Sequence, residues 1–268
     1  MKFFLLTCTV FFVACSSTKQ IPVIPIPNTL PQNISLNGKL FSALFHQRAA
    51  EYRALCLQGY NIARMRMDNY VPLSDKPKVI ITDIDETIFD NSPYAVHQAY
   101  LGKEYIVPDW YTWTDMAAAD TMPGAAALLQ YAAAKNIEVF YVTNREERER
   151  ASTTANLKHF NLPFADDAHL VMKQTGSSKE ARRQKIMASY EVVVLMGDNL
   201  ADFNALFDKK TEAERRNNVD QLSAEFGKKF IVFPNPNYGD WESSMYKYNY
   251  QLSQGQKDSV MRSVLKSY

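Results

Sequence analysis

Short runs of apolar residues recur in the middle of the chain, and amphipathic segments flank them. The runs lie within residues 78–88, 136–145 and 191–203. Unbroken apolar, β-branched runs of this kind are typical of strands covered on both faces of a parallel sheet. Before them, residues 36–67 place Leu44, Leu55 and similar side chains among polar ones, which predicts one or two core-packing helices. The pattern predicts an α/β, doubly wound parallel sheet, with a last helix from about residue 251.

Carboxylates follow two of the apolar runs. Asp83 and Asp85 follow the first run, and Asp198 and Asp202 follow the last one. Gly197 lets the backbone turn, and a spacing of four brings Asp198 and Asp202 together where a helix begins. Two unit charges about 4 Å apart repel by about 4 kcal/mol at an effective dielectric of about 20. Four clustered carboxylates therefore need a cation or altered protonation, and a hard ion such as Mg²⁺ suits oxygen ligands.

Polar residues after the middle run suit a phosphate group. Thr143 and Asn144 stand where that strand is expected to end, and a hydroxyl with a nearby backbone N–H can hold a phosphate oxygen. Farther along, a helix is expected to begin with Ser177 or Ser178 as its cap and Lys179 in its first turn. A lysine opposes the helix macrodipole there, which suggests that Lys179 meets another anion.

The order of these elements resembles that of the haloacid dehalogenase superfamily. An Asp-x-Asp pair, a threonine, a lysine and a Gly-Asp-x-x-x-Asp segment follow one another along the chain. The resemblance covers roughly residues 40 to 250. It narrows to class C acid phosphatases of the bacterial lipoprotein e type through four segments: Ile-Asp-Glu-Thr at 84–87, Gly-Asp-Asn-Leu-Ala-Asp-Phe at 197–203, Ala-Glu-Tyr-Arg-Ala-Leu at 50–55, and Asn-Pro-Asn-Tyr-Gly-Asp-Trp at 235–241.

The resemblance implies a Mg²⁺-dependent acid phosphatase that hydrolyses phosphomonoesters through an aspartyl-phosphate. Asp83 would be the nucleophile and Asp85 the general acid. The ion would bind Asp83, the backbone carbonyl of Asp85, and Asp198, while Asp202 would bind it or stand just behind its ligands. Phosphoryl transfer needs a nucleophile, an acid and a cation. It also needs groups that bind the phosphate, here Thr143, Asn144 and Lys179.

Asp85 bears on both the pH optimum and the choice between reactions. It must carry a proton when it acts, which neighbouring carboxylates favour, so an acidic pH optimum is expected. Dehalogenation is disfavoured because it needs no acid at this position. A surface ligand-binding lipoprotein without turnover is the alternative from another class, and it has no need of a nucleophile.

Residues 92–122 form an aromatic-rich insertion between the first strand and the next helix. Packing within a small cap would explain any single one of these aromatic side chains. As a group above an active site, they would instead stack on the ring of a substrate. In the resembling family such residues clamp the ring, which implies Trp113 and Tyr238 here, with Trp110 as the alternative to Trp113. Nucleoside monophosphates are the expected substrates. The rings of the insertion are Tyr94, Tyr100, Tyr105, Trp110, Tyr111 and Trp113.

The amino terminus predicts export. Residues 1–14 hold one basic residue and an apolar run too short to span a bilayer, as in a signal peptide. Phe-Val-Ala before Cys15 resembles a bacterial lipobox with phenylalanine in place of the usual leucine, so Cys15 is expected to be lipidated. Secretion with cleavage elsewhere is the alternative. Residues 15–32 would tether an acid phosphatase domain of residues 33–268 to the membrane of the cell envelope, with the outer membrane expected.

Composition excludes several other classes of protein. Once residues 1–14 are removed and Cys15 is lipidated, Cys56 remains without a disulfide partner. The net charge of +1 gives no electrostatic footprint for a nucleic acid polymer. The four histidines lack zinc-ligand spacing. The expected partners are a small phosphomonoester and the membrane, and the oligomeric state stays open, a homodimer included.

Overall fold

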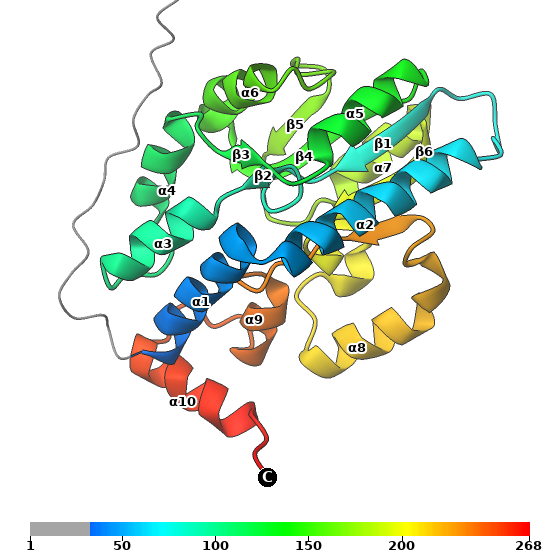
Figure 1. Cartoon of the computed structure of the whole chain (residues 1–268). Coiled ribbons are helices and arrows are strands. Elements are labelled where there is room, and N and C mark those ends of the chain that lie inside the picture. The colour runs from blue at the N-terminus through cyan, green and yellow to red at the C-terminus, as the bar shows by residue number, and fades with distance from the viewer. Residues whose placement is uncertain (1–32) are drawn as a thin grey trace, which may run out of the picture.

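A central parallel sheet organises the part of the chain that the computed structural model describes, residues 33–268. The predicted signal peptide, Cys15 and the tether lie outside these residues. The sheet has five parallel strands in the order β5-β4-β1-β6-β7, which confirms the predicted fold class (Figure 1). The strands are β1 (Lys78–Thr82), β4 (Glu138–Glu146), β5 (Leu170–Lys173), β6 (Glu191–Gly197) and β7 (Phe230–Val232).

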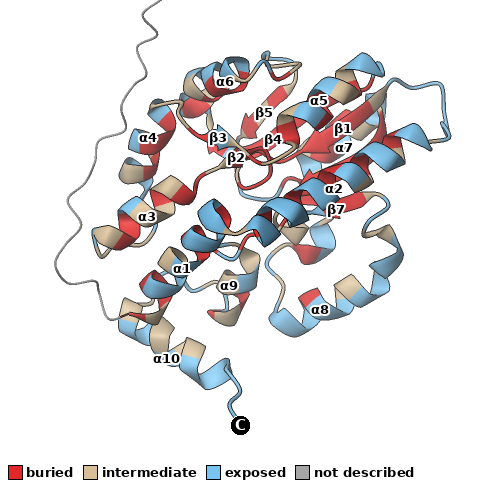
Figure 2. Cartoon of the chain, viewed as in Figure 1, coloured by how far each residue is buried: buried red, intermediate tan, exposed pale blue. Residues whose placement is uncertain are grey.

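Helices cover both faces of this sheet. Ile80 of β1 packs into the cluster under α2 (Ala50–Asp68) and α5 (Ala125–Ala134), while its neighbours Val79 and Ile81 pack into the cluster under α7 (Glu180–Ser189). Burial of each such side chain contributes roughly 1.5–3 kcal/mol. Two-sided burial explains the unbroken apolar runs, and Figure 2 shows the strands buried almost throughout. Helices α6 (Arg150–His159), α8 (Glu212–Gln221) and α9 (Asp240–Met245) follow β4, β6 and β7 along the chain.

The segment before the sheet forms two helices, α1 (Ile34–Arg48) and α2, which meet at Ala49 in an extended conformation. The buried stripe of α2 includes Tyr52 and Cys56, so Leu55 lies off its axis. Leu44 and Leu55 are 54% and 45% exposed, and the prediction that they face the core is wrong. The last helix, α10 (Gln254–Val264), packs on α1 through bonds such as Ile34 N–H to Asp258 at 3.1 Å.

The aromatic-rich insertion contributes two helices beside the carboxyl ends of the strands. They are α3 (Ser92–Tyr100) and α4 (Val107–Asp115), framed by the antiparallel pair β2 (Phe89–Asp90) and β3 (Asp120–Thr121). The helix α3 packs against α1 (Figure 1). Among the helices of residues 33–268, none is both long and apolar enough to cross a membrane.

Candidate active site

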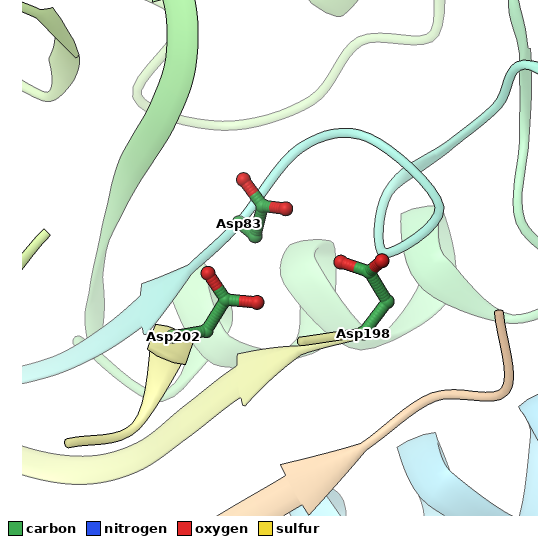
Figure 3. Close-up of side chains that lie close together, drawn as sticks. All are labelled: Asp83, Asp198 and Asp202. Atoms are coloured by element: carbon green, nitrogen blue, oxygen red, sulfur yellow. The ribbon is translucent and has the colours of Figure 1, made fainter. Parts of the chain in front are cut away.

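The register of the central strands brings the predicted acids together. Thr82 pairs with Met196 of β6, and the N–H of Asp83 donates to the Met196 carbonyl at 2.9 Å, which extends the ladder by one residue. Asp83 and Asp198 therefore leave neighbouring strands at the same edge. Carboxylate oxygens of Asp83, Asp198 and Asp202 all lie within 4.8 Å of one another, and Figure 3 shows the three groups converging.

Gly197 is required for space rather than for the turn that the sequence suggested. A β-carbon at this position would lie 2.3 Å from Oδ2 of Asp202, so no larger residue fits without displacing that carboxylate. Asp202 ends a single 3-10 turn, Leu200–Asp202, and its Oδ2 accepts the N–H of Asn199 at 3.0 Å. The expected proximity of Asp198 and Asp202 is confirmed, because carboxylate oxygens of the two lie within 4.8 Å of each other.

Lys179 supplies a buried cation to these acids. Its side chain is 6% exposed, and its Nζ lies 2.5 Å from Asp83 Oδ1 and 2.6 Å from Asp202 Oδ1. Burial alone would lower the pKa of Lys179, but the charges of Asp202 and Asp83 raise it. Lys179 is the N-cap of α7 rather than a first-turn residue. The predicted serine cap is wrong because Ser178 precedes the N-cap, where its hydroxyl donates to Asp208 and accepts the Glu180 N–H at 3.4 Å. The anion expected for Lys179 is thus carboxylate in this structure.

Of the three clustered acids, Asp198 is the one that makes no ion pair with a side chain of residues 33–268. Burial, reinforced by Asp202 and Asp83, raises the pKa of Asp198 well above its usual range, and its hydrogen bond comes from the Asn235 amide at 2.7 Å. Burial also raises the pKa of Asp83 to about 6, although Lys179 opposes the shift. A hard divalent cation would suit these buried oxygen donors and offset their charge. The donor set therefore fits a metal ion beside Asp198 and Asp83.

The carboxylate of Asp85 is hydrogen-bonded by one guanidinium and one amide. Its Oδ1 lies 2.7 Å from Nη2 of the buried Arg145, whose Nε donates to both carboxylate oxygens at 3.1 and 3.2 Å. Asn91 donates to the same Oδ1 at 2.9 Å. The expected carboxylate neighbours are present, since burial and the charge of Asp85 both raise the pKa values of Glu86 and Asp83, but an ion pair with Arg145 was not expected. Sequence reasoning missed Arg145, although it directly follows Thr143 and Asn144.

Of the two strand-end residues expected to bind phosphate, Asn144 lines the same cavity as Asp83, whereas Thr143 is buried outside its lining. Strand β4 runs to Glu146, past the end predicted at Thr143 and Asn144. The hydroxyl of Thr143 is buried and accepts the Arg145 N–H at 3.1 Å. Arg182, which sequence reasoning also missed, donates to Thr143 O at 2.5 Å and to Asn144 Oδ1 at 2.7 Å. Arg182 thus connects α7, the helix that begins next to Lys179, to the end of β4.

A cavity of about 700 Å³ opens above these groups. Trp110 lines it, whereas Trp113 is buried outside its lining, so the structure favours the alternative residue. Tyr238 also lines the cavity, and its hydroxyl donates to the buried Glu86. Burial, followed by Asp85, raises the pKa of Glu86 to about 8. The aromatic lining consists of Tyr94, Tyr105, Trp110, Tyr238 and Tyr250.

Comparison with known proteins gives consistent matches. The family model described as HAD superfamily, subfamily IIIB (acid phosphatase), matches residues 13–241. A class C acid phosphatase from Bacillus anthracis is 35% identical with a TM-score of 0.84, over 87% of this chain and 99% of that one. The tungstate-bound structure of a class C acid phosphatase from Bacillus anthracis is 34% identical with a TM-score of 0.83, over 87% of this chain and 98% of that one.

Curated plant proteins match over a shorter stretch. Acid phosphatase 1 of Solanum lycopersicum is 26% identical over 136 residues, which are 48% of this chain and 52% of that protein. The stem 31 kDa glycoprotein of Glycine max is 24% identical over 130 residues, 46% of this chain and 51% of that protein. The chain thus spans about half the length of these curated relatives.

Proposed function

The chain belongs to the acid phosphatases of HAD subfamily IIIB, and we propose that it hydrolyses phosphomonoesters through an aspartyl-phosphate on Asp83 with a bound Mg²⁺. The observation that carries this proposal is the arrangement around Asp83. The side chain is buried and lines the cavity, 2.5 Å from Lys179 and within 4.8 Å of Asp198 and Asp202. A ligand-binding protein without turnover would have no use for a buried, cation-paired carboxylate facing its cavity.

The proposed reaction has two steps. A carboxylate oxygen of Asp83 attacks phosphorus, the bond to the leaving oxygen breaks, and Asp85 gives that oxygen its proton. Asp85 then takes a proton from water as that water attacks phosphorus, and the bond between phosphorus and Asp83 breaks, which releases phosphate and restores both residues. A Mg²⁺ held by Asp83, Asp198 and the Asp85 carbonyl would neutralise charge on the phosphate oxygens.

The other polar residues assist in the proposed reaction. Lys179, Thr143 and the backbone of Asn144 would bind the remaining phosphate oxygens. Asp202, which contacts Lys179 at 2.6 Å, holds that ammonium beside the nucleophile. Phosphate release from nucleoside monophosphates and ring-free esters, with and without Mg²⁺, tests the function. Absence of phosphate release from all of these esters would refute it.

We propose nucleoside monophosphates as substrates because aromatic rings line the cavity. Tyr105 is 60% exposed at this lining, and it lies in a cluster with Tyr94 and Trp110, with ring centroids 6.2 and 6.0 Å away. Such rings tolerate any base, because every base has a flat π-face.

Tyr105→Ala should weaken nucleotide hydrolysis selectively. Stacking on one ring is worth about 1–3 kcal/mol, so kcat/KM for a nucleoside monophosphate should fall roughly tenfold while that for glycerol phosphate changes little. Tyr100→Ala is a matched control, because Tyr100 belongs to the same insertion but lies outside this cavity. The ratio of the two efficiencies is the measurement. An unchanged ratio in Tyr105→Ala would assign this ring to cap packing.

We also propose that Cys15 carries lipid and anchors the protein in the bacterial cell envelope. The support is the short apolar run before Cys15 and the polar, proline-rich stretch after it. Wild-type protein expressed in bacteria should incorporate labelled fatty acid and enter the detergent phase, since more than one acyl chain gives stable attachment. Cys15→Ser should lose the label, with Cys56→Ser as control. Equal labelling of Cys15→Ser and wild type would place the lipid elsewhere.

A further inference from the structure

We infer that Arg145, Asn91 and Trp113 are positioning residues that hold the carboxyl group of Asp85 for proton transfer. This inference rests on the proposed function, in which Asp85 protonates the leaving oxygen. It assigns a role to three buried residues of the described chain, two of which sequence reasoning did not single out.

Arg145 fixes the plane of the Asp85 carboxyl group. Its Nη2 donates to Oδ1 at 2.7 Å and its Nε donates to Oδ2 at 3.2 Å, a fork that constrains both the position and the rotation of that group. The guanidinium is itself fixed, because Nη1 donates to the hydroxyl of Thr153 at 3.1 Å and the side chain is 2% exposed. A rigid arginine beside a partly exposed acid can therefore set where that acid points.

Asn91 and Trp113 supply a second constraint. The amide of Asn91 donates to Asp85 Oδ1 at 2.9 Å, and its own oxygen accepts the indole N–H of Trp113 at 2.8 Å. Because an indole nitrogen only donates, it fixes which end of the amide faces Asp85. Trp113 is packed in the hydrophobic core outside the cavity lining. Its indole reaches the proposed acid through Asn91 instead of meeting substrate.

The contacts of Arg145 extend the arrangement into the substrate cavity. The guanidinium carbon lies 5.7 Å from the ring centroid of Phe89 and 5.7 Å from that of Trp110, within range of cation–π attraction. Trp110 lines the cavity, and Trp110 and Trp113 both belong to α4. The insertion thus contacts Asn91 through one tryptophan and the cavity through the other.

A series of leaving groups distinguishes positioning of the acid from general support of the fold. An alkoxide or unsubstituted phenolate needs a proton as it departs, whereas 4-nitrophenolate leaves without one. Arg145→Lys keeps the positive charge but loses the fork. Its kcat/KM for phenyl phosphate and alkyl phosphates should fall about 100-fold, and that for 4-nitrophenyl phosphate less than about fivefold. Arg148→Lys is the control, since Arg148 is exposed and pairs with Asp115.

Trp113→Phe provides a second variant that keeps the buried ring and removes its N–H. The same selectivity should appear, at about tenfold for phenyl phosphate, and this variant decides the matter if Arg145→Lys does not fold. Equal losses across all leaving groups would overturn the inference and leave these residues a structural role. Failure of the wild-type protein to release phosphate from any ester would instead refute the proposed function.

Discussion

Asp83→Asn should lower kcat/KM for any phosphomonoester by at least about 10⁴-fold, because a neutral amide cannot replace the attacking carboxylate. The substitution preserves shape, and Lys179 keeps Asp202 as a partner at 2.6 Å. Burial raises the pKa of Asp83 to about 6, so the protonated form is the one that favours the fold. The stabilisation of the folded state by protonated Asp83 is lost as the pH rises through about 6. The variant should therefore melt no lower than wild type at neutral pH.

Steady-state phosphate release and a thermal melt, both at neutral pH, test this prediction together. Asp75→Asn is a matched control, since Asp75 is an exposed aspartate before the amino end of β1, at the opposite edge of the sheet. It should keep wild-type turnover. Near wild-type activity in Asp83→Asn would mean that another group attacks phosphorus. Loss of both activity and folding would show that Asp83 is needed for the fold.

Removal of divalent metal should silence the enzyme, and Mg²⁺ should restore it. Burial and the charges of Asp202 and Asp83 raise the pKa of Asp198 well above normal, and Lys179 contacts the other two acids instead. A metal ion is the cation that this carboxylate lacks. Asp198→Asn should raise the Mg²⁺ concentration needed for half-maximal activity by at least about tenfold, since a neutral amide binds the ion less well.

The measurement is a Mg²⁺ titration of activity after dialysis against EDTA, with calorimetric Mg²⁺ binding as an independent readout. Asp208→Asn is a suitable control, because Asp208 also lines the cavity but bonds Ser178 rather than the acid cluster. It should require the same Mg²⁺ concentration as wild type. Full activity of metal-stripped wild-type protein would contradict the metal assignment.

The sheet and its acids were predictable because their signals are local. Unbroken apolar runs mark buried parallel strands, and parallel strands in register place Asp83 and Asp198 at one edge. The unfavourable helix position of Lys179 likewise indicated an anionic partner. Gly197 shows the limit of local reasoning, since its need for space arises from the side chain of Asp202.

The surroundings of Asp85 were not predictable, because they depend on how distant elements pack. Trp110 and Trp113 stand one helical turn apart on α4 and are both buried, so periodicity cannot tell which one lines the cavity. Arg145 meets Asp85 across sixty positions of sequence, and no spacing rule links them. The charge of Arg145 was visible in the sequence, but its partner depended on the pairing of β1 with β4.

Trapping of the phosphorylated enzyme tests the central claim most directly. Wild-type protein mixed with a phosphomonoester and quenched in acid should gain one phosphoryl group, and peptide mapping by mass spectrometry should place it on Asp83. Asp83→Asn should gain none under the same conditions. A phosphoryl group on any other residue, or turnover without a phosphorylated protein when hydrolysis of the intermediate is rate-limiting, would contradict the account.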